Sequence, residues 1–123
     1  MNILIVEDSS SVRNFIAAIL ENDLGADIVQ AANGMEAMKV LPQHRFDVIL
    51  TDINMPEING LELISFLKRH PAYQAIPVVI ISTEASRQDR ERGLELGATA
   101  YITKPFNEQL LADEVRQIVE AVC

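Results

Sequence analysis

Four charged side chains follow apolar, strand-like segments of this chain. Glu7 and Asp8 end the first such segment, Asp52 ends the third and Lys104 follows the fifth. Brought together, three carboxylates would repel one another by about 4 kcal/mol for each close pair at an effective dielectric constant near 20. A lysine offsets part of this repulsion and a divalent cation offsets more. The donors are hard oxygens without a nearby His or Cys, which favours Mg²⁺.

Such a cluster suits phosphoryl transfer. A carboxylate can attack a phosphoryl group and form an aspartyl phosphate, and we assign this role to Asp52. Lys104 would bind one phosphoryl oxygen, and Thr83, which follows the fourth apolar segment, would donate a hydrogen bond to another. The added charge would draw Thr83 inward, which predicts a local switch.

Composition narrows the function further. The chain has 123 residues and a formal net charge of -8, which suits one domain spanning residues 1–123 and argues against nucleic-acid binding by bulk electrostatics. Its single cysteine, Cys123, forms no intramolecular disulfide. The sequence shows no signal peptide and no apolar run long enough for a membrane helix. We therefore expect a cytoplasmic protein with no membrane partner.

Apolar segments alternate with helical patterns along the whole chain. Five segments followed by five helices predict a parallel α/β sheet. The first, third and fourth segments are the most apolar, which places them at the centre and gives the strand order 2-1-3-4-5 of the doubly wound, flavodoxin-like folds. Right-handed crossovers then put the first and last helices on one face and the middle three on the other. The five segments are residues 3–6, 27–31, 46–50, 77–81 and 99–102.

This topology brings the charged residues together. All strand carboxyl ends lie along one edge of a parallel sheet, and the strand order reverses between the first and third strands, where ligands bind. Glu7 and Asp8 would lie on one side of that crevice and Asp52 on the other. Thr83 and Lys104 would stand at the ends of the next two strands.

Several helix details are also predicted. Ser9 or Ser10 would cap the first helix, and Phe15 would lie on its apolar stripe. Asn33 with Glu36 resembles a capping box. The Arg/Glu-rich helix after the fourth strand has few large apolar residues, so we expect it to be the least firmly held, with Gly93 weakening it further. We also expect Ser86, with Asp89, to cap this helix, and Val122 to lie on the apolar face of the last helix.

Taken in order, these motifs resemble the receiver domain of bacterial two-component response regulators, including the chemotaxis regulator. Each motif is weak alone, but the ordered set is specific and covers nearly the whole chain. The motifs are Glu7-Asp8, then Asp52 with Met55-Pro56 and Gly60, then Ser82-Thr83, then Lys104-Pro105-Phe106.

The resemblance implies a role for each matching residue. Asp52 would be the phosphoacceptor; Asp8 and Asp52 would bind Mg²⁺ directly and Glu7 through water, and Asn54 would offer its backbone carbonyl. Thr83 and Tyr101 would form the switch. Lys104 would pair with the phosphate. Receivers often have a cis peptide bond at the position of Lys104-Pro105, whereas residue type alone predicts trans. Ala85 occupies a position that influences phosphoryl lifetime in the family.

Partners follow from the same resemblance. The phosphoryl donor would be a sensor histidine kinase or a histidine phosphotransfer protein, and the output would be a downstream protein or an output domain outside this chain. The helix after the fourth strand, the fifth strand and the last helix would form the docking surface. Two alternatives are weaker. An aspartate-based phosphohydrolase usually has a second Asp where this chain has Asn54. In a flavodoxin-like cofactor binder, Glu7 and Asp8 would repel the phosphate group of the cofactor.

Overall fold

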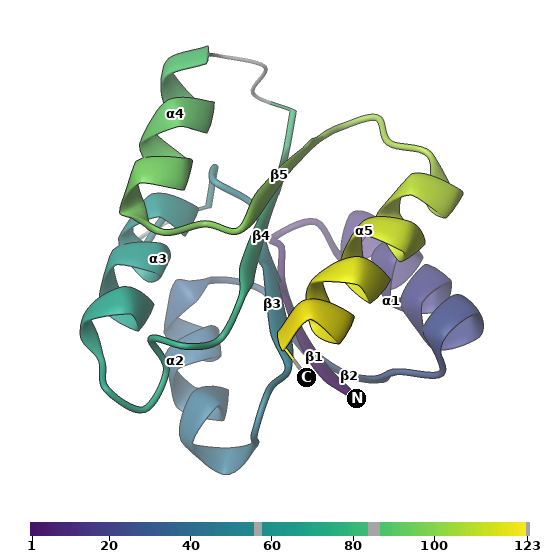
Figure 1. Cartoon of the computed structure of the whole chain (residues 1–123), viewed down its shortest axis with the longest axis horizontal. Coiled ribbons are helices and arrows are strands. Elements are labelled where there is room, and N and C mark those ends of the chain that lie inside the picture. The colour runs from purple at the N-terminus through teal and green to yellow at the C-terminus, as the bar shows by residue number, and fades with distance from the viewer. Residues whose placement is uncertain (56–57, 84–86, 123) are drawn as a thin grey trace.

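The computed structural model describes residues 1–55, 58–83 and 87–122. In this part of the chain, five strands alternate with five α-helices and one short 3₁₀ helix (Figure 1). The elements are β1 (Asn2–Val6), α1 (Ser10–Leu24), β2 (Asp27–Ala31), α2 (Gly34–Val40), η1 (Leu41–Gln43), β3 (Val48–Thr51), α3 (Gly60–Arg69), β4 (Val78–Ser82), α4 (Arg87–Leu96), β5 (Ala100–Thr103) and α5 (Glu108–Val122).

The strands form one parallel sheet in the order β2-β1-β3-β4-β5, as predicted. Every residue of β3 and β4 is buried, whereas β2 and β5 have exposed positions. The predicted division into central and edge strands is therefore confirmed. It follows from the continuous apolar runs that strands covered on both faces require.

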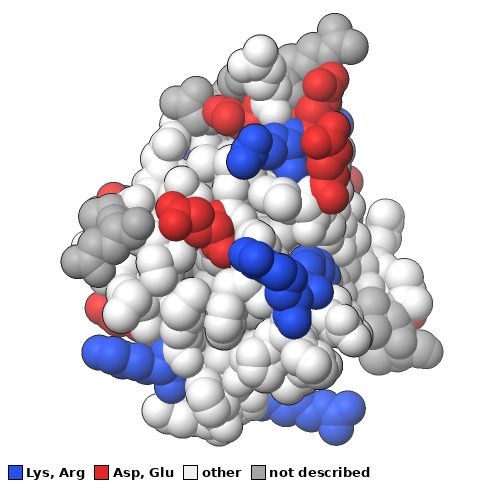
Figure 2. All heavy atoms as spheres, turned by 90° about the vertical axis from the view of Figure 1, so that its left-hand side faces the viewer, with Lys and Arg blue, Asp and Glu red and all other residues white. Residues whose placement is uncertain are grey.

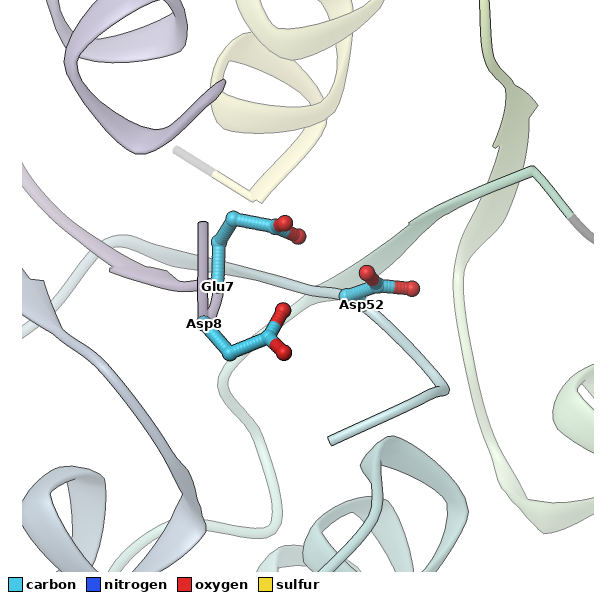
Figure 3. Close-up of side chains that lie close together, drawn as sticks. All are labelled: Glu7, Asp8 and Asp52. Atoms are coloured by element: carbon cyan, nitrogen blue, oxygen red, sulfur yellow. The ribbon is translucent and has the colours of Figure 1, made fainter. Parts of the chain in front are cut away.

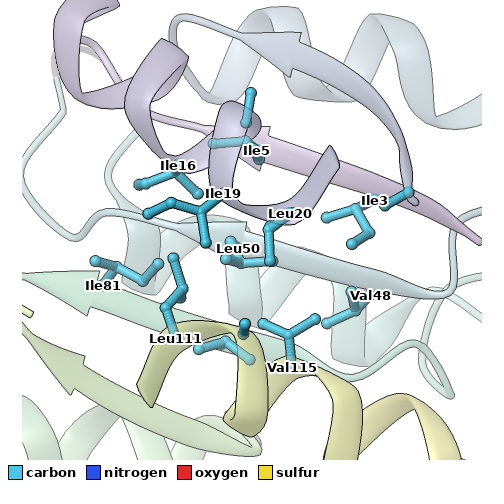
Figure 4. Packing of buried hydrophobic residues seen from close by; sticks show 14 of the residues in the cluster. Ile3, Ile5, Ile16, Ile19, Leu20, Val48, Leu50, Ile81, Leu111 and Val115 are labelled. Atoms are coloured by element: carbon cyan, nitrogen blue, oxygen red, sulfur yellow. The ribbon is translucent and has the colours of Figure 1, made fainter. Parts of the chain in front are cut away.

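Two apolar clusters hold the helices against the sheet. One joins α1 and α5 to one face, and Figure 4 shows this packing, with Leu20 and Leu111 among its fully buried side chains. The other joins α2 and α3 to the opposite face, where α4 also lies (Figure 1). Burying one such Leu or Ile side chain contributes about 1.5–3 kcal/mol. The predicted distribution of helices over the two faces is confirmed.

Helix caps fix where the elements begin. The Ser9 side chain accepts a hydrogen bond from the Val12 amide at 3.4 Å and so caps α1. Asn33 caps α2 as expected, but the Glu36 carboxylate accepts from the Ala32 amide at 3.0 Å rather than from Asn33. The sequence reasoning overlooked a complete capping box at the start of α3, formed by Asn59 and Glu62.

Some local expectations were wrong. Phe15 is 47% exposed, whereas Val12 and Ile16 of the same stripe pack on the core, and the Phe15 ring contacts Phe106 with centroids 6.0 Å apart. The Lys104-Pro105 peptide bond is cis, against the expectation from residue type and in agreement with what the resemblance implies.

Other expectations concern residues or side chains that the structure does not describe. Ser86 and Ala85 lie outside the described residues, as does the Val122 side chain. Within the described ranges, no helix is long and apolar enough to cross a membrane.

Candidate functional site

The neighbouring strands β1 and β3 end at the same level of the sheet. Val6 is the register partner of Thr51, and the Asp52 amide donates to the Val6 carbonyl at 3.1 Å. Glu7 and Asp8 therefore leave the sheet beside Asp52. Glu7 and Asp8 are far from Asp52 in sequence but lie beside it at the sheet edge predicted from the strand order.

The same holds for β4 and β5. Ser82 pairs with Thr103, and the Lys104 amide donates to the Ser82 carbonyl at 2.9 Å. Thr83 and Lys104 thus follow neighbouring strands at the carboxyl edge. The Thr83 side chain is exposed there.

The three acidic side chains converge (Figure 3). Glu7, Asp8 and Asp52 each offer one carboxylate oxygen, and these oxygens lie within 4.8 Å of one another. Glu7 and Asp52 are buried, whereas Asp8 is exposed. A compact set of hard oxygen donors with one side open to solvent fits a divalent cation that keeps part of its water shell, as Mg²⁺ does.

Lys104 supplies the cationic partner. Its ammonium group donates to Glu7 Oε2 at 3.1 Å and to Asp52 Oδ2 at 3.2 Å. The Lys104 side chain is only 13% exposed, so solvent screens these contacts weakly. One positive charge faces two buried carboxylates, and an excess of negative charge remains.

The pKa of Glu7 is raised to about 7. Burial of the carboxyl group is the largest cause, and the hydrogen bond and charge of Asp52 add to it, while Lys104 acts in the opposite direction. Glu7 Oε1 also accepts from the Ser9 amide at 3.3 Å. Glu7 thus takes up a proton more readily than a solvent-exposed glutamate does.

The backbone around Asp52 is tightly fixed. The Asn54 amide donates to Asp52 Oδ1 at 3.3 Å, and the Asn54 side chain is exposed. Gly60, at the start of α3, lies so close to the Asp52 carbonyl that a Cβ atom there would clash with it. The Gly60 amide donates to Ile53 O at 2.9 Å. This close approach gives a physical reason for glycine at position 60.

Tyr101 packs against an apolar cluster on one face of the sheet. It is half-buried on β5, in register with Ile80, and packs against the apolar cluster shared with α3. Of the residues predicted for the site, Glu7, Asp8, Asp52 and Lys104 therefore meet directly.

Sequence reasoning missed Arg13. Its Nη1 atom donates to the Glu7 carbonyl at 2.7 Å, and its Nε atom donates to Gln30 Oε1 at 2.9 Å. A signal was present, because a basic residue near the start of a helix opposes the helix dipole and needs a compensating partner.

Comparisons with known proteins agree with this geometry. The family model for the response regulator receiver domain matches residues 3–116. A chemotaxis protein CheY homolog of Campylobacter jejuni is 33% identical over 97% of this chain and 92% of its own length.

Solved structures give the same picture. Vibrio cholerae CheY4 has a TM-score of 0.88 at 33% identity, covering 95% of this chain and 97% of the other. A receiver domain of a signal transduction histidine kinase from Syntrophus aciditrophicus has a TM-score of 0.90 at 37% identity, covering 98% and 91%. The family match, the strand order and the acidic cluster agree, and the chain belongs to the response regulator receiver domain family of two-component signalling.

Proposed function

We propose that residues 1–123 form a single receiver domain in which Asp52 accepts a phosphoryl group. An Asp52 carboxylate oxygen attacks phosphorus, a P–O bond forms, and the bond from phosphorus to the donor breaks, with its electron pair leaving on the donor. The donor is a phosphohistidine of a sensor kinase or phosphotransfer protein. Receiver domains are signalling domains, so this chemistry modifies the domain itself rather than a diffusible substrate.

The metal site is the second part of the proposal. Asp8 and Asp52 would hold Mg²⁺ directly, Glu7 through water, and Asn54 through its backbone carbonyl. When bound, Mg²⁺ neutralises charge on the carboxylates and on the transferring group. Lys104 fixes the Asp52 carboxylate and offers a donor for a phosphoryl oxygen.

The third part concerns output. The exposed Thr83 hydroxyl would turn toward the phosphoryl group, and Tyr101 would change rotamer with it. The surface of α4, β5 and α5 would then present a different face to a downstream protein or output domain. Exposed Leu94 on α4 and Leu110 on α5 offer apolar contacts. Figure 2 shows acidic and basic side chains interspersed over the face that carries α2, α3 and α4, which favours a protein partner over nucleic acid at the α4 part of this surface.

One observation carries the proposal: three carboxylates and one lysine, from the ends of β1, β3 and β5, lie within hydrogen-bonding or metal-binding reach of one another. Intact-mass spectrometry after incubation with acetyl phosphate tests it. We expect one labile phosphoryl group with Mg²⁺, and none with chelator or in Asp52→Asn.

Asp47→Asn is a matched control, because Asp47 precedes β3 at the opposite edge of the sheet, where its carboxylate accepts from the Asn2 amide at 2.7 Å. That variant should be phosphorylated like the wild type. Phosphorylation that survives in Asp52→Asn, or sustained hydrolysis of small phosphate esters, would contradict the assignment.

A further inference from the structure

The acidic residues of the cluster differ in how their side chains are held. Glu7 and Asp52 each accept hydrogen bonds from Lys104 and from a backbone amide. Among the described residues, no hydrogen bond holds the Asp8 carboxylate, which is exposed. The position of Asp8 therefore depends on its backbone.

Arg13 fixes that backbone. The carbonyl of Glu7 and the amide of Asp8 belong to one planar peptide unit, so the direction of the Glu7 carbonyl sets the orientation at the Asp8 Cα atom. Arg13 Nη1 donates to this carbonyl at 2.7 Å, which is a short, charge-assisted bond. On the other side of the residue, the Glu7 amide donates to Ala31 O on β2 at 3.0 Å.

The guanidinium group is itself held. Arg13 Nε donates to Gln30 Oε1 at 2.9 Å, and Gln30 lies on the neighbouring strand β2. A planar fork that donates to two acceptors at once has one preferred orientation, which a lysine ammonium cannot reproduce. Gln30, Arg13 and the Glu7 carbonyl thus form a brace across β2, α1 and the β1–α1 turn.

We propose that Arg13 is a positioning residue for the acidic cluster, which acts through the Glu7–Asp8 peptide to set Asp8 for divalent-cation binding. This inference rests on the proposed function, since it assumes that the cluster binds Mg²⁺. Arg13 would then contribute to the metal site without belonging to the group of carboxylates and lysine that forms it.

Positioning and charge have opposite consequences, which makes the proposal testable. If Arg13 acted only through its charge, Arg13→Gln would remove a positive charge from beside the site and tighten Mg²⁺ binding, and Arg13→Lys would leave it unchanged. If Arg13 positions Asp8, both substitutions weaken binding. The sign of the change for Arg13→Gln therefore decides between the two roles.

The experiment is a Mg²⁺ titration at constant ionic strength, followed by backbone amide chemical shifts. We expect Arg13→Gln to weaken Mg²⁺ binding by about tenfold, which is typical for residues that orient metal ligands. Arg13→Lys and Gln30→Ala should fall between this variant and the wild type. In the metal-free protein, the Asp8 and Ser9 amide signals should shift in Arg13→Gln.

Arg69→Gln is the matched control. Arg69 also donates through its guanidinium group to a backbone carbonyl and a side chain, both of Ser65, but at the C-terminal end of α3. It should leave Mg²⁺ binding unchanged. If Arg13→Gln failed to fold, Arg13→Lys and Gln30→Ala would carry the test.

Each result has a distinct meaning. Equal or tighter Mg²⁺ binding by Arg13→Gln, beside a wild type that binds Mg²⁺, would overturn the positioning role and leave the proposed function intact. A folded wild type that binds no Mg²⁺ would overturn the metal site of the proposed function, and the positioning role with it.

Discussion

Glu7 carries the electrostatic cost of assembling the site. It is almost completely buried, lies beside Asp52, and shares a single lysine with it. Burial of the carboxyl group raises the pKa of Glu7 to about 7, with the neighbouring Asp52 adding to the effect and Lys104 opposing it. In the absence of a cation, this residue therefore couples the stability of the domain to pH.

The metal-free protein should lose stability as pH rises through 7. The pKa of Glu7 is raised from 4.5 to about 7 on folding, so between these values the native state binds more protons than the unfolded state. The contribution of Glu7 to the free energy of unfolding is present in full below pH 4.5 and lost above pH 7, with a size on the order of 3 kcal/mol. Urea unfolding in chelator at pH 5 and pH 8 measures it.

Glu7→Gln is the control for this pH dependence. The amide cannot ionise, so the difference in unfolding free energy between the two pH values should shrink in this variant. An identical pH dependence in wild type and Glu7→Gln would show that another group is responsible.

At the scale of elements, α4 is held by a close approach rather than by large side chains. Leu94 is exposed and Leu96 half-buried, in line with the few apolar residues of this helix. Gly93, however, is buried against Ile80 of β4, and a Cβ atom there would clash with the Ile80 side chain. The glycine that weakens the helix by propensity thus allows it to lie against the sheet.

Gly93→Ala should therefore destabilise the protein despite the better helix propensity of alanine. Ile80 is fully buried and has little room to move, so we expect a loss of about 1–2 kcal/mol from overpacking. Ile80→Val, which removes the clashing methyl group, should cost about 1 kcal/mol alone.

The double variant Gly93→Ala/Ile80→Val isolates the contact between these two residues. It should be more stable than the sum of the two single effects implies, because the valine makes room for the alanine methyl group. Chemical unfolding of all four proteins gives the coupling. Strict additivity would mean that the Gly93–Ile80 contact does not determine how α4 packs.

The capping box of α3 connects an element boundary to the site. Asn59 Oδ1 accepts from the Glu62 amide at 2.9 Å, one residue before Gly60 packs on the Asp52 carbonyl. Asn59→Ala should lower the unfolding free energy by about 1 kcal/mol. It should also slow phosphorylation by acetyl phosphate, because the start of α3 helps to fix Asp52.

Asn33→Ala is the matched variant, since Asn33 caps α2 with the same 2.9 Å geometry. We expect a similar loss of stability with little change in phosphorylation rate. Equal effects of both variants on that rate would mean that general stability, rather than the start of α3, governs Asp52.

For the whole molecule, sequence patterns predicted the topology because each element has one dominant signal. The apolar runs of β1, β3 and β4 specify buried strands, and their order brings Glu7, Asp8 and Asp52 together at one edge of the sheet. What escaped prediction depends on contacts between elements. The brace by Arg13 and the packing of Gly93 need a neighbour that residue type alone does not name. The Lys104-Pro105 cis bond was implied by the family resemblance and not by residue type alone.

The excess of acidic residues should make the stability of the domain depend on Mg²⁺. Eighteen acidic residues against ten basic ones leave the domain repelling itself, and the acidic cluster concentrates that repulsion. Without metal, Asp8→Asn should therefore be more stable than the wild type. With Mg²⁺ at ten times its dissociation constant, the wild type should gain about 1.4 kcal/mol and the variant much less.

The two proteins should thus approach one another in stability, or exchange their order, as Mg²⁺ is added. Thermal unfolding at matched ionic strength separates this site-specific gain from general screening by salt. Asp27→Asn, at an exposed position at the start of β2, should keep the full Mg²⁺ gain. If Asp8→Asn gained as much from Mg²⁺ as the wild type, the repulsion at the crevice would be structural only, and the cation would act elsewhere.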